Sequence, residues 1–346
     1  MTFSGATRPI RIVVADDSPT DRALLIALCE QDPEITVVGE AKDGAQAIHL
    51  TRRLRPALVL MAVHMPGVDG LEATKAIMRD TPTPIIMVTA GTTSNDVEAG
   101  LSAIRFGALT VVPKPTGPGL AGHRQSAERL TSMVKALADV KVIQRRIRTD
   151  PSATHRLDPR ARILAVAAST GGPAALCGFL QHLPATLPIP VVVVQHLVPG
   201  FLSGLVDWLR AEVPFPVKQA ARNEVLQPGT VYLAPDGMHL EVTAQLRAVL
   251  TDAPPVAGFR PSASVLFDSI ARTSGAAGIA VVLTGMGQDG LTGARELHAA
   301  GGLVLAQDEQ TCAVFGMPRV VIEAGITACV GSVEALAARV KHNLRR

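Results

Sequence analysis

The chain alternates short apolar runs with longer segments of helical apolar spacing. Five runs in its first part are rich in β-branched residues and read as strands buried on both faces of a sheet. They are IRIVVA (10–15), ITVVGE (35–40), ALVLMA (57–62), PIIMVTA (84–90) and LTVVP (109–113). Helical spacing lies between them, as in the set Ala23, Leu24, Ala27 and Leu28. A fifth helical pattern runs from Leu130 to Val140. This alternation predicts a parallel sheet with helices on both faces.

A second pattern of the same kind begins at Ala161. Its clearest strands are RILAVAA (162–168), PVVVVQH (190–196), TVYLAP (230–235), IAVVLTG (279–285) and GLVLAQ (302–307), with helical patterns at 173–183 and 291–301. The stretch between the two patterns, TDPSATHRLDPR, lacks periodicity and contains two prolines, which is typical of a linker. The predicted fold class is therefore α/β, with two doubly wound parallel-sheet domains at 9–148 and 161–346 joined by a linker at 149–160.

Composition narrows the class of protein. The 346 residues are 47% hydrophobic, which is enough for two buried cores, and the net charge of +3 favours neither nucleic acid nor a membrane surface as partner. With 3% aromatic residues, a base-stacking surface is not expected. The four cysteines are far apart and without metal-ligand spacing, so we expect small apolar core residues of a reducing compartment. Neither a signal peptide nor a membrane span is evident, which predicts a soluble cytoplasmic protein with no membrane insertion.

Three segments of the second half carry residues suited to catalysis, and each follows a predicted parallel strand. They are AASTGG (167–172), QHLVPGF (195–201) and TGMGQDG (284–290). Ligands of open α/β sheets bind at the carboxyl ends of the strands, at the point where the strand order reverses. Each segment alone has an ordinary structural explanation: a helix N-cap, a satisfied core histidine and an Asp-Gly turn. Three further histidines, His182, His239 and His298, have no partners that the sequence reveals.

Together the three segments predict a nucleophilic triad. A serine is a weak nucleophile until a neighbouring base accepts its proton, and that base needs a carboxylate to orient it. Ser169, His196 and Asp289 supply these three groups. Their order along the chain differs from that of the α/β-hydrolases, of chymotrypsin and of subtilisin, and Ala167 stands where a GxSxG elbow has its first glycine. The glycines after Ser169 would let a substrate approach the backbone.

These segments, together with FRPSASVLF (259–267) and AQDEQTCAVFGMPR (306–319), resemble the catalytic domain of the chemotaxis protein-glutamate methylesterases, the CheB family. The resemblance implies hydrolysis of glutamate γ-methyl esters on chemoreceptors and deamidation of receptor glutamines. It makes Ser169 the nucleophile, His196 the base and Asp289 its orienting carboxylate. Thr170, Gly171 and the backbone around Met286 would hold the oxyanion and substrate. No cofactor is expected for this hydrolysis.

Two positions depart from the family pattern. Phe259 stands where a histidine often precedes Arg-Pro-Ser, and Ser264 stands where an aspartate is frequent. Both lie outside the triad, so we expect them to alter contacts with the substrate and not the reaction.

VVADDS (13–18), HMPGVDG (64–70), VTA (88–90) and VPKP (112–115) resemble a response-regulator receiver. The resemblance makes Asp16 and Asp17 the acidic pair for Mg²⁺, and Thr89 and Lys114 the residues that read phosphorylation. The phosphoacceptor aspartate is replaced by Ala62, and neither His64 nor Asp69 in the following loop is a convincing substitute. A weak Mg²⁺ site at Asp16 and Asp17 is the most that remains, since a ligand has been lost. The sequence does not separate a naturally degenerate receiver from an introduced substitution.

The sequence leaves alternatives open for both the regulation and the function of the protein. In the family, the unphosphorylated receiver covers the catalytic cleft, so the receiver here could be permanently closed, permanently loose, or moved by a partner; we favour docking of a receptor or of a sensor histidine kinase complex. The rival to an active hydrolase is a pseudo-receiver adaptor that binds chemoreceptors without turnover. A DNA-binding response regulator would need a basic recognition helix after the linker, and the basic residues of 141–162 lie on the last receiver helix and the linker instead.

Overall fold

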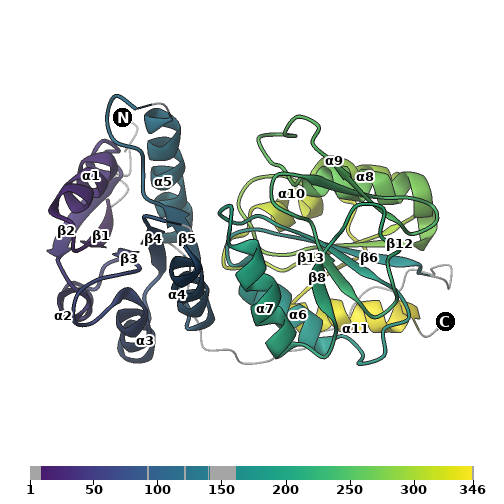
Figure 1. The fold of residues 1–346 in the computed structure, drawn as a ribbon, viewed down its shortest axis with the longest axis horizontal. Helices are drawn as coiled ribbons and strands as arrows, with labels where there is room; N and C mark the ends of the chain where they lie inside the picture. Colours follow the sequence, from purple (N-terminus) through teal and green to yellow (C-terminus); the bar gives the residue numbers. More distant parts are fainter. Residues whose placement is uncertain (1–8, 92, 121, 139, 141–160, 345–346) are drawn as a thin grey trace, which may run out of the picture. The chain divides into compact units, whose positions relative to one another are not determined.

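The computed structural model describes residues 9–344 except 92, 121, 139 and 141–160. These residues form two compact units, one within Met1–Arg145 and the other within Arg146–Arg346, and each is treated by itself. The predicted linker at 149–160, and with it the exact ends of the two predicted domains, lies outside the described residues. The predicted fold class is confirmed, since both units are parallel α/β sheets with helices on both faces (Figure 1).

The first unit is built on a five-stranded parallel sheet in the order β2-β1-β3-β4-β5. The strands are β1 (Ile10–Ala15), β2 (Ile35–Ala41), β3 (Leu58–Ala62), β4 (Ile85–Thr89) and β5 (Thr110–Pro113). The helices are α1 (Pro19–Glu30), α2 (Gly44–Leu54), α3 (Gly70–Asp80), α4 (Ser94–Arg105) and α5 (His123–Ala138). Helices α1 and α5 contact each other on one face, while α2, α3 and α4 pack in sequence on the other (Figure 1).

Side-chain caps explain where four of these helices begin. Ser18, Asp43, Asp69 and Thr93 each accept a hydrogen bond from a backbone N–H of the first turn of α1, α2, α3 and α4. Such a cap satisfies one of the N–H groups that a helix leaves without an internal partner. The helices therefore begin directly after the strand-end loops and hold those loops in place.

Two predictions for this unit, the burial of β2 and the end of the last helix, need correction. β2 was predicted to be buried on both faces, but it is an edge strand with partly exposed residues. The helix indicated by the spacing of Ala23, Leu24, Ala27 and Leu28 is present as α1, and its buried residues are Leu25, Leu28 and Cys29. The last helix ends at Ala138, two residues before Val140.

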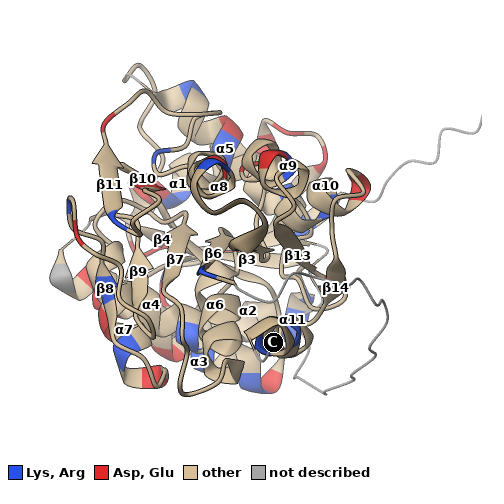
Figure 2. Cartoon of the chain, turned by 90° about the vertical axis from the view of Figure 1, so that its right-hand side faces the viewer, with Lys and Arg blue, Asp and Glu red and all other residues tan. Residues whose placement is uncertain are grey.

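The second unit is built on a seven-stranded parallel sheet in the order β14-β13-β12-β6-β7-β9-β8. The strands are β6 (Ile163–Ala168), β7 (Val191–Gln195), β8 (Val217–Gln219), β9 (Val231–Leu233), β12 (Gly278–Val282), β13 (Leu303–Gln307) and β14 (Cys329–Gly331). The helices are α6 (Gly172–His182), α7 (Leu202–Glu212), α8 (Ala263–Ser274), α9 (Leu291–Ala299), α10 (Met317–Glu323) and α11 (Val333–Leu344), with a short 3₁₀ turn at Gly275–Ala277. Figure 2 shows α8, α9 and α10 on one face of this sheet and α6, α7 and α11 on the other.

An antiparallel pair of strands, β10 (His239–Val242) and β11 (Ala248–Thr251), lies outside the main sheet. The sequence did not single out this pair. Its inward residues, Leu240, Val242, Ala248 and Leu250, join the core between the sheet and α8. The pair leads directly into the loop that precedes α8, and this connection brings His239 and Phe259 into the site described below.

The cysteines are free thiols, as expected from their spacing. Cys29 and Cys177 are buried, whereas Cys312 and Cys329 are only half-buried, so the expected core role holds fully for the first two. Burial raises the pKa of Cys29 to about 12, which leaves its thiol protonated near neutral pH. Among the described residues, no helix is both long enough and apolar enough to span a membrane.

Candidate active site

The three predicted triad residues lie at the carboxyl ends of adjacent strands. Ser169 follows β6, His196 follows β7, and Asp289 lies in the loop after β12. β6 is central, with β7 on one side and β12 on the other, so the chain order of the strands reverses on its two sides. Parallel α/β sheets bind ligands in the crevice above such a reversal. The structure thus brings together three residues that are far apart in the sequence.

His196 and Asp289 are hydrogen-bonded. The distance from His196 Nε2 to Asp289 Oδ2 is 3.0 Å, and the side chains are 10% and 1% exposed. The other ring nitrogen, His196 Nδ1, is buried and has no hydrogen-bond partner among the described residues. When Nε2 carries the proton that it donates to Asp289, Nδ1 has a free lone pair and can accept a proton from a serine hydroxyl.

Asp289 is held by the beginning of helix α8. Its Oδ1 accepts hydrogen bonds from the Ser262 hydroxyl at 2.7 Å, Ser264 N–H at 3.1 Å and Gly290 N–H at 2.9 Å. Its Oδ2 also accepts from Ala263 N–H at 2.7 Å. The positive end of the helix dipole favours a carboxylate at this place.

These contacts decide the charge of Asp289. Burial by itself would raise the pKa of Asp289, but the hydrogen bond and charge of His196, together with the Ser262 hydroxyl and Ala263 N–H, lower it to about 2. The carboxylate is therefore ionised throughout the physiological range and can stabilise a protonated His196.

The backbone of Ser169 is fixed from two sides. Ser169 N–H donates to Thr284 O at 3.0 Å, and the Gln195 side chain donates from Nε2 to Ser169 O at 2.8 Å and to His196 O at 3.0 Å. Gln195 is 5% exposed, and sequence reasoning did not identify it. It joins the nucleophile loop to the histidine loop, although the Ser169 hydroxyl itself makes no hydrogen bond to the imidazole in the described structure.

The glycines around Ser169 are required by packing within the protein. A Cβ on Gly171 would lie 2.4 Å from Ala313 Cβ, and one on Gly172 would lie 2.3 Å from Gln195 Oε1. A Cβ on Gly285 would lie 2.8 Å from Ser169 Cβ. The sequence suggested that the glycines after Ser169 admit the substrate; the structure shows that they admit neighbouring protein segments.

Donors for an oxyanion lie beside the serine. In the described part of the chain, the backbone N–H groups of Thr170, Gly171 and Met286 have no hydrogen-bond acceptor. Thr170 and Gly171 immediately precede α6, where helix N–H groups are unpaired, and Met286 follows the glycine that lies against Ser169. These are the positions that the sequence suggested for holding an oxyanion.

Phe259 and Ser264, which we expected to affect substrate contacts only, both touch the triad. The ring of Phe259 is stacked on that of His196, with centroids 4.2 Å apart and planes inclined by 9°. Ser264 donates its N–H to Asp289, and its hydroxyl accepts from Gly290 N–H at 2.8 Å. Both positions therefore lie in contact with residues of the triad, which the sequence did not reveal.

His239 also has partners that the sequence did not reveal. It is 1% exposed; its Nδ1 accepts from Ser262 N–H at 3.2 Å and its Nε2 lies 3.2 Å from Pro254 O. His239 therefore connects the loop around Pro254 to Ser262, which in turn holds Asp289. His239 acts through Ser262, which holds a triad residue, and the pattern of a single sequence does not reveal an indirect contact of this kind.

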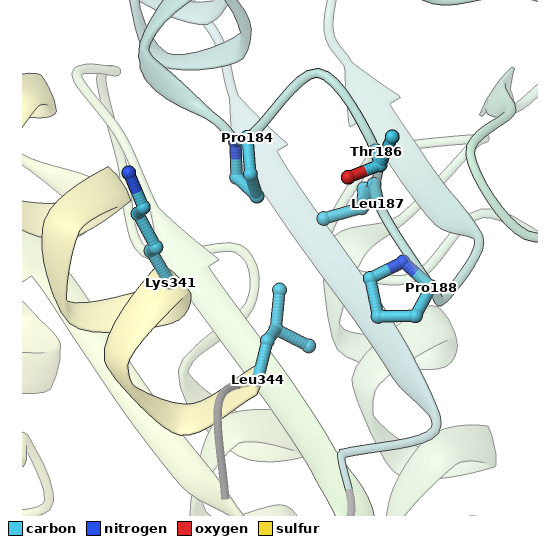
Figure 3. Close-up of a pocket in the computed structure, with 6 residues that line it drawn as sticks. All are labelled: Pro184, Thr186, Leu187, Pro188, Lys341 and Leu344. Atoms are coloured by element: carbon cyan, nitrogen blue, oxygen red, sulfur yellow. The ribbon is translucent and has the colours of Figure 1, made fainter.

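A hollow of about 440 Å³ lies away from the triad (Figure 3). Its lining residues are Pro184, Thr186, Leu187, Pro188, Lys341 and Leu344. They come from the segment that enters β7 and from the end of α11, at the amino ends of the strands. The hollow is therefore at the opposite edge of the sheet from Ser169.

The receiver-like unit has an analogous strand-end cluster. Lys114 Nζ lies 2.8 Å from Asp16 Oδ2 and 2.6 Å from Asp21 Oδ2, and Asp16 is fully buried. Burial would lower the pKa of Lys114, but the hydrogen bonds and charges of Asp16 and Asp21 raise it above its usual value. Asp17 is exposed, and Thr89 donates its hydroxyl to Gly91 O at 3.0 Å. The predicted acidic pair therefore has one buried member, which is paired with Lys114, and one exposed member.

These residues do not fit a magnesium ion. Asp16 faces an ammonium group, and buried Ala62 at the end of β3 offers no oxygen. Within the described ranges, no group of three His, Cys, Asp or Glu side chains could hold a metal. His64 Nε2 lies 2.9 Å from Asp96 Oδ1, while Asp69 caps α3, so both candidate substitutes for the phosphoacceptor have other partners.

Fold and sites together define a response regulator: a receiver unit with the sheet order 2-1-3-4-5, followed by an α/β unit with a serine, histidine and aspartate at one sheet edge. Residues 12–120 match the response regulator receiver domain model, and residues 164–340 match the CheB methylesterase model. The chain belongs to the CheB methylesterase family.

Relatives of known name support this assignment. A protein-glutamate methylesterase/protein-glutamine glutaminase 4 of Myxococcus xanthus is 50% identical, over 97% of this chain and 98% of its own length. A protein of the same name, numbered 3, from Anaeromyxobacter dehalogenans is 46% identical over 97% and 100%. The crystal structure of the Thermotoga maritima CheB methylesterase catalytic domain is 37% identical, with a TM-score of 0.51, and covers 53% of this chain and 98% of that domain.

Proposed function

We propose that this chain is a serine hydrolase that removes methyl groups from glutamate γ-methyl esters of chemoreceptors and deamidates receptor glutamines to glutamate. The observation that carries the proposal is the state of His196. One of its ring nitrogens is hydrogen-bonded to Asp289, the other is buried without a hydrogen-bond partner among the described residues, and the Gln195 amide joins the His196 backbone to that of Ser169. This is the arrangement that a general base needs. The names of the relatives supply the substrate class.

The reaction follows from these groups. Ser169 Oγ attacks the γ-carbonyl carbon while its proton passes to His196 Nδ1. The N–H groups of Thr170, Gly171 and Met286 receive the oxyanion, and Asp289 stabilises the imidazolium. The tetrahedral intermediate expels methanol, or ammonia from glutamine, and the leaving group takes the proton from His196. Water then attacks the acyl-enzyme with His196 again as base, which releases the glutamate side chain and restores Ser169. The named protein groups and water account for every step, so the proposed reaction needs no metal or organic cofactor.

The test is methanol release from methylated receptor membranes by the full chain. Ser169→Ala should lower kcat by about 10⁴-fold or more, since it removes the nucleophile. The matched control is Ser203→Ala, because Ser203 is an exposed serine of α7 in the same unit. Equal rates for wild type and Ser169→Ala would reject the nucleophile, and absence of turnover on several receptors would favour the adaptor alternative.

We further propose that the receiver-like unit regulates by docking or occlusion, and not by its own phosphorylation. Two features support this: Ala62 replaces the phosphoacceptor, and Lys114 is paired with Asp16 and Asp21. Acetyl phosphate with Mg²⁺ should leave methanol release from receptor membranes by the full chain unchanged, whereas addition of a sensor kinase complex should change it. Stimulation by acetyl phosphate would contradict this proposal and leave the hydrolase assignment intact.

A further inference from the structure

The aromatic contact on the triad histidine is unusually well aligned. The rings of Phe259 and His196 are 4.2 Å apart between centroids and within 9° of parallel. Phe259 is half-buried, although the seven residues before it, 252–258, are exposed. The half-buried position of this ring at the end of an exposed loop is explained by hydrogen bonds within the loop.

The loop that carries Phe259 is held by its own backbone. Val256 and Phe259 exchange two backbone hydrogen bonds, of 3.1 and 2.9 Å, around a two-residue turn. The turn residues Ala257 and Gly258 have φ of 51° and 85°, as required by a tight hairpin of this hand. The direction of the Phe259 side chain is thus set by a closed turn.

Two side chains hold this turn, one from the loop itself and one from the rest of the unit. Arg260 donates from Nη1 to Asp252 O at 2.8 Å and to Ala253 O at 3.2 Å. His239 accepts at Nδ1 from Ser262, so its Nε2 carries the proton and donates to Pro254 O. Ser262 also holds Asp289, and the loop is therefore connected to the carboxylate that orients His196.

The ring of Phe259 lies against a face of the His196 ring, and this face makes no hydrogen bond. Asp289 contacts the edge of the imidazole at Nε2, and Nδ1 has no hydrogen-bond partner among the described residues, whereas Phe259 covers a ring face. A neutral imidazole gains packing from this contact. An imidazolium gains more, because a cation over an aromatic face is attracted by the negative face of the ring. In the proposed reaction that cation forms only as Ser169 loses its proton.

We propose that Phe259 is a positioning residue for catalysis: it holds the plane of the His196 ring and stabilises the imidazolium that forms in the transition state. The inference rests on the proposed hydrolase function. An interaction that strengthens in the transition state raises kcat and leaves substrate binding nearly unchanged. Phe259 thereby contributes to the reaction without touching the scissile bond.

The first test compares full-chain variants in methanol release. Phe259→Leu should lower kcat by about 3-fold to 30-fold with KM within about 2-fold of wild type, from the usual range of cation–π interactions. Phe259→Tyr and Phe259→Trp should restore most of the rate. The matched control is Phe106→Leu, because Phe106 is a 45%-exposed aromatic with Lys75 over its ring in the other unit. An unchanged kcat in Phe259→Leu, or a change in KM alone, would overturn the inference.

The second test separates charge stabilisation from packing. Pentafluorophenylalanine at position 259 keeps the ring shape but reverses the charge distribution of its face, so kcat should fall to about that of Phe259→Leu. A rate equal to that of wild type would mean that Phe259 acts by packing only, and it would overturn the proposed stabilisation of the imidazolium.

A third readout does not need the receptor substrate. A fluorophosphonate reacts with an activated serine: the Ser169 Oγ–P bond forms, the P–F bond breaks, fluoride leaves and His196 takes the proton. Slower labelling of Phe259→Leu than of wild type, with no methanol release by either, would support Phe259 and reject the substrate class. Normal methanol release with equal labelling rates would reject the role of Phe259 and leave the proposed hydrolase function intact.

Discussion

His196 Nε2 lies 3.0 Å from Asp289 Oδ2, and this contact determines which nitrogen of the ring can act as base. Asp289 accepts further hydrogen bonds from the first residues of α8, so it is a rigid acceptor with one direction left for the imidazole. Because Nε2 is engaged, proton transfer in the proposed reaction uses Nδ1. A hydrolase built on this pair depends on the position of α8 as much as on the three triad residues.

Asp289→Asn should lower kcat for methanol release by about 10⁴-fold. The amide keeps the shape of the side chain, but it neither stabilises an imidazolium nor guarantees the required tautomer of His196. Steady-state kinetics checks this. The control is Asp268→Asn on α8, where the partly exposed carboxylate pairs with Arg272. A loss of less than 10-fold in Asp289→Asn would contradict the proposed role.

The stability of the second unit should fall as pH decreases from about 4 towards 2. The folded pKa of Asp289 is about 2, against an ordinary value of 3.8. A lowered folded pKa stabilises the folded state above the unfolded pKa, and this contribution is lost as pH falls through the folded pKa. The expected loss is about 2 kcal/mol of unfolding free energy.

Urea unfolding of the full chain, followed by the fluorescence of Trp208, measures this change. Trp208 is the only tryptophan and lies on α7, so it reports the second unit. In Asp289→Asn the free energy of unfolding should depend less on pH over this window. The same dependence in both proteins would show that other carboxylates cause it.

Gly285→Ala should reduce kcat by about 100-fold. The new Cβ would lie 2.8 Å from Ser169 Cβ and 2.5 Å from Met317 Sδ, so the nucleophile loop must shift, and small misplacements of reacting groups are costly. Kinetics and circular dichroism together check that the loss is local. Gly117→Ala is the control, since its Cβ would meet only Leu120 Cδ1 at 3.9 Å. Wild-type activity in Gly285→Ala would mean that the loop position tolerates this shift.

Ala62→Asp should create a phosphoacceptor. The strand register pairs Ala15 with Met61 and Ala62 with Val88, so position 62 lies at the strand ends where Asp16 follows β1 and Thr89 ends β4, with Lys114 N–H hydrogen-bonded to Thr89 O. The new carboxylate would add the missing oxygen ligand for Mg²⁺ and compete for the Lys114 ammonium. Mass spectrometry after incubation with acetyl phosphate and Mg²⁺ should show phosphate on the variant. Equal labelling of the wild type would instead indicate another acceptor.

Much of the architecture could be predicted from apolar periodicity. The ten strands predicted from such runs all exist, because a buried parallel strand needs a continuous apolar run. The short strands β8 and β14 and the pair β10 and β11 were not predicted, since none of them lies in an apolar run as long as the one that indicated the equally short β9. The exposed residues of β2 were also missed, because edge position depends on strand order and not on the run itself.

The sequence by itself determined the fold class, the residue types at the strand ends and the absence of a carboxylate at position 62. These follow from local periodicity and from the chemistry of single side chains. Only the tertiary structure decided which nitrogen of His196 faces Asp289, that Phe259 covers its ring, and that Lys114 pairs with Asp16. Such contacts join residues far apart in the chain, and they depend on loop paths and helix starts that single-residue patterns do not specify.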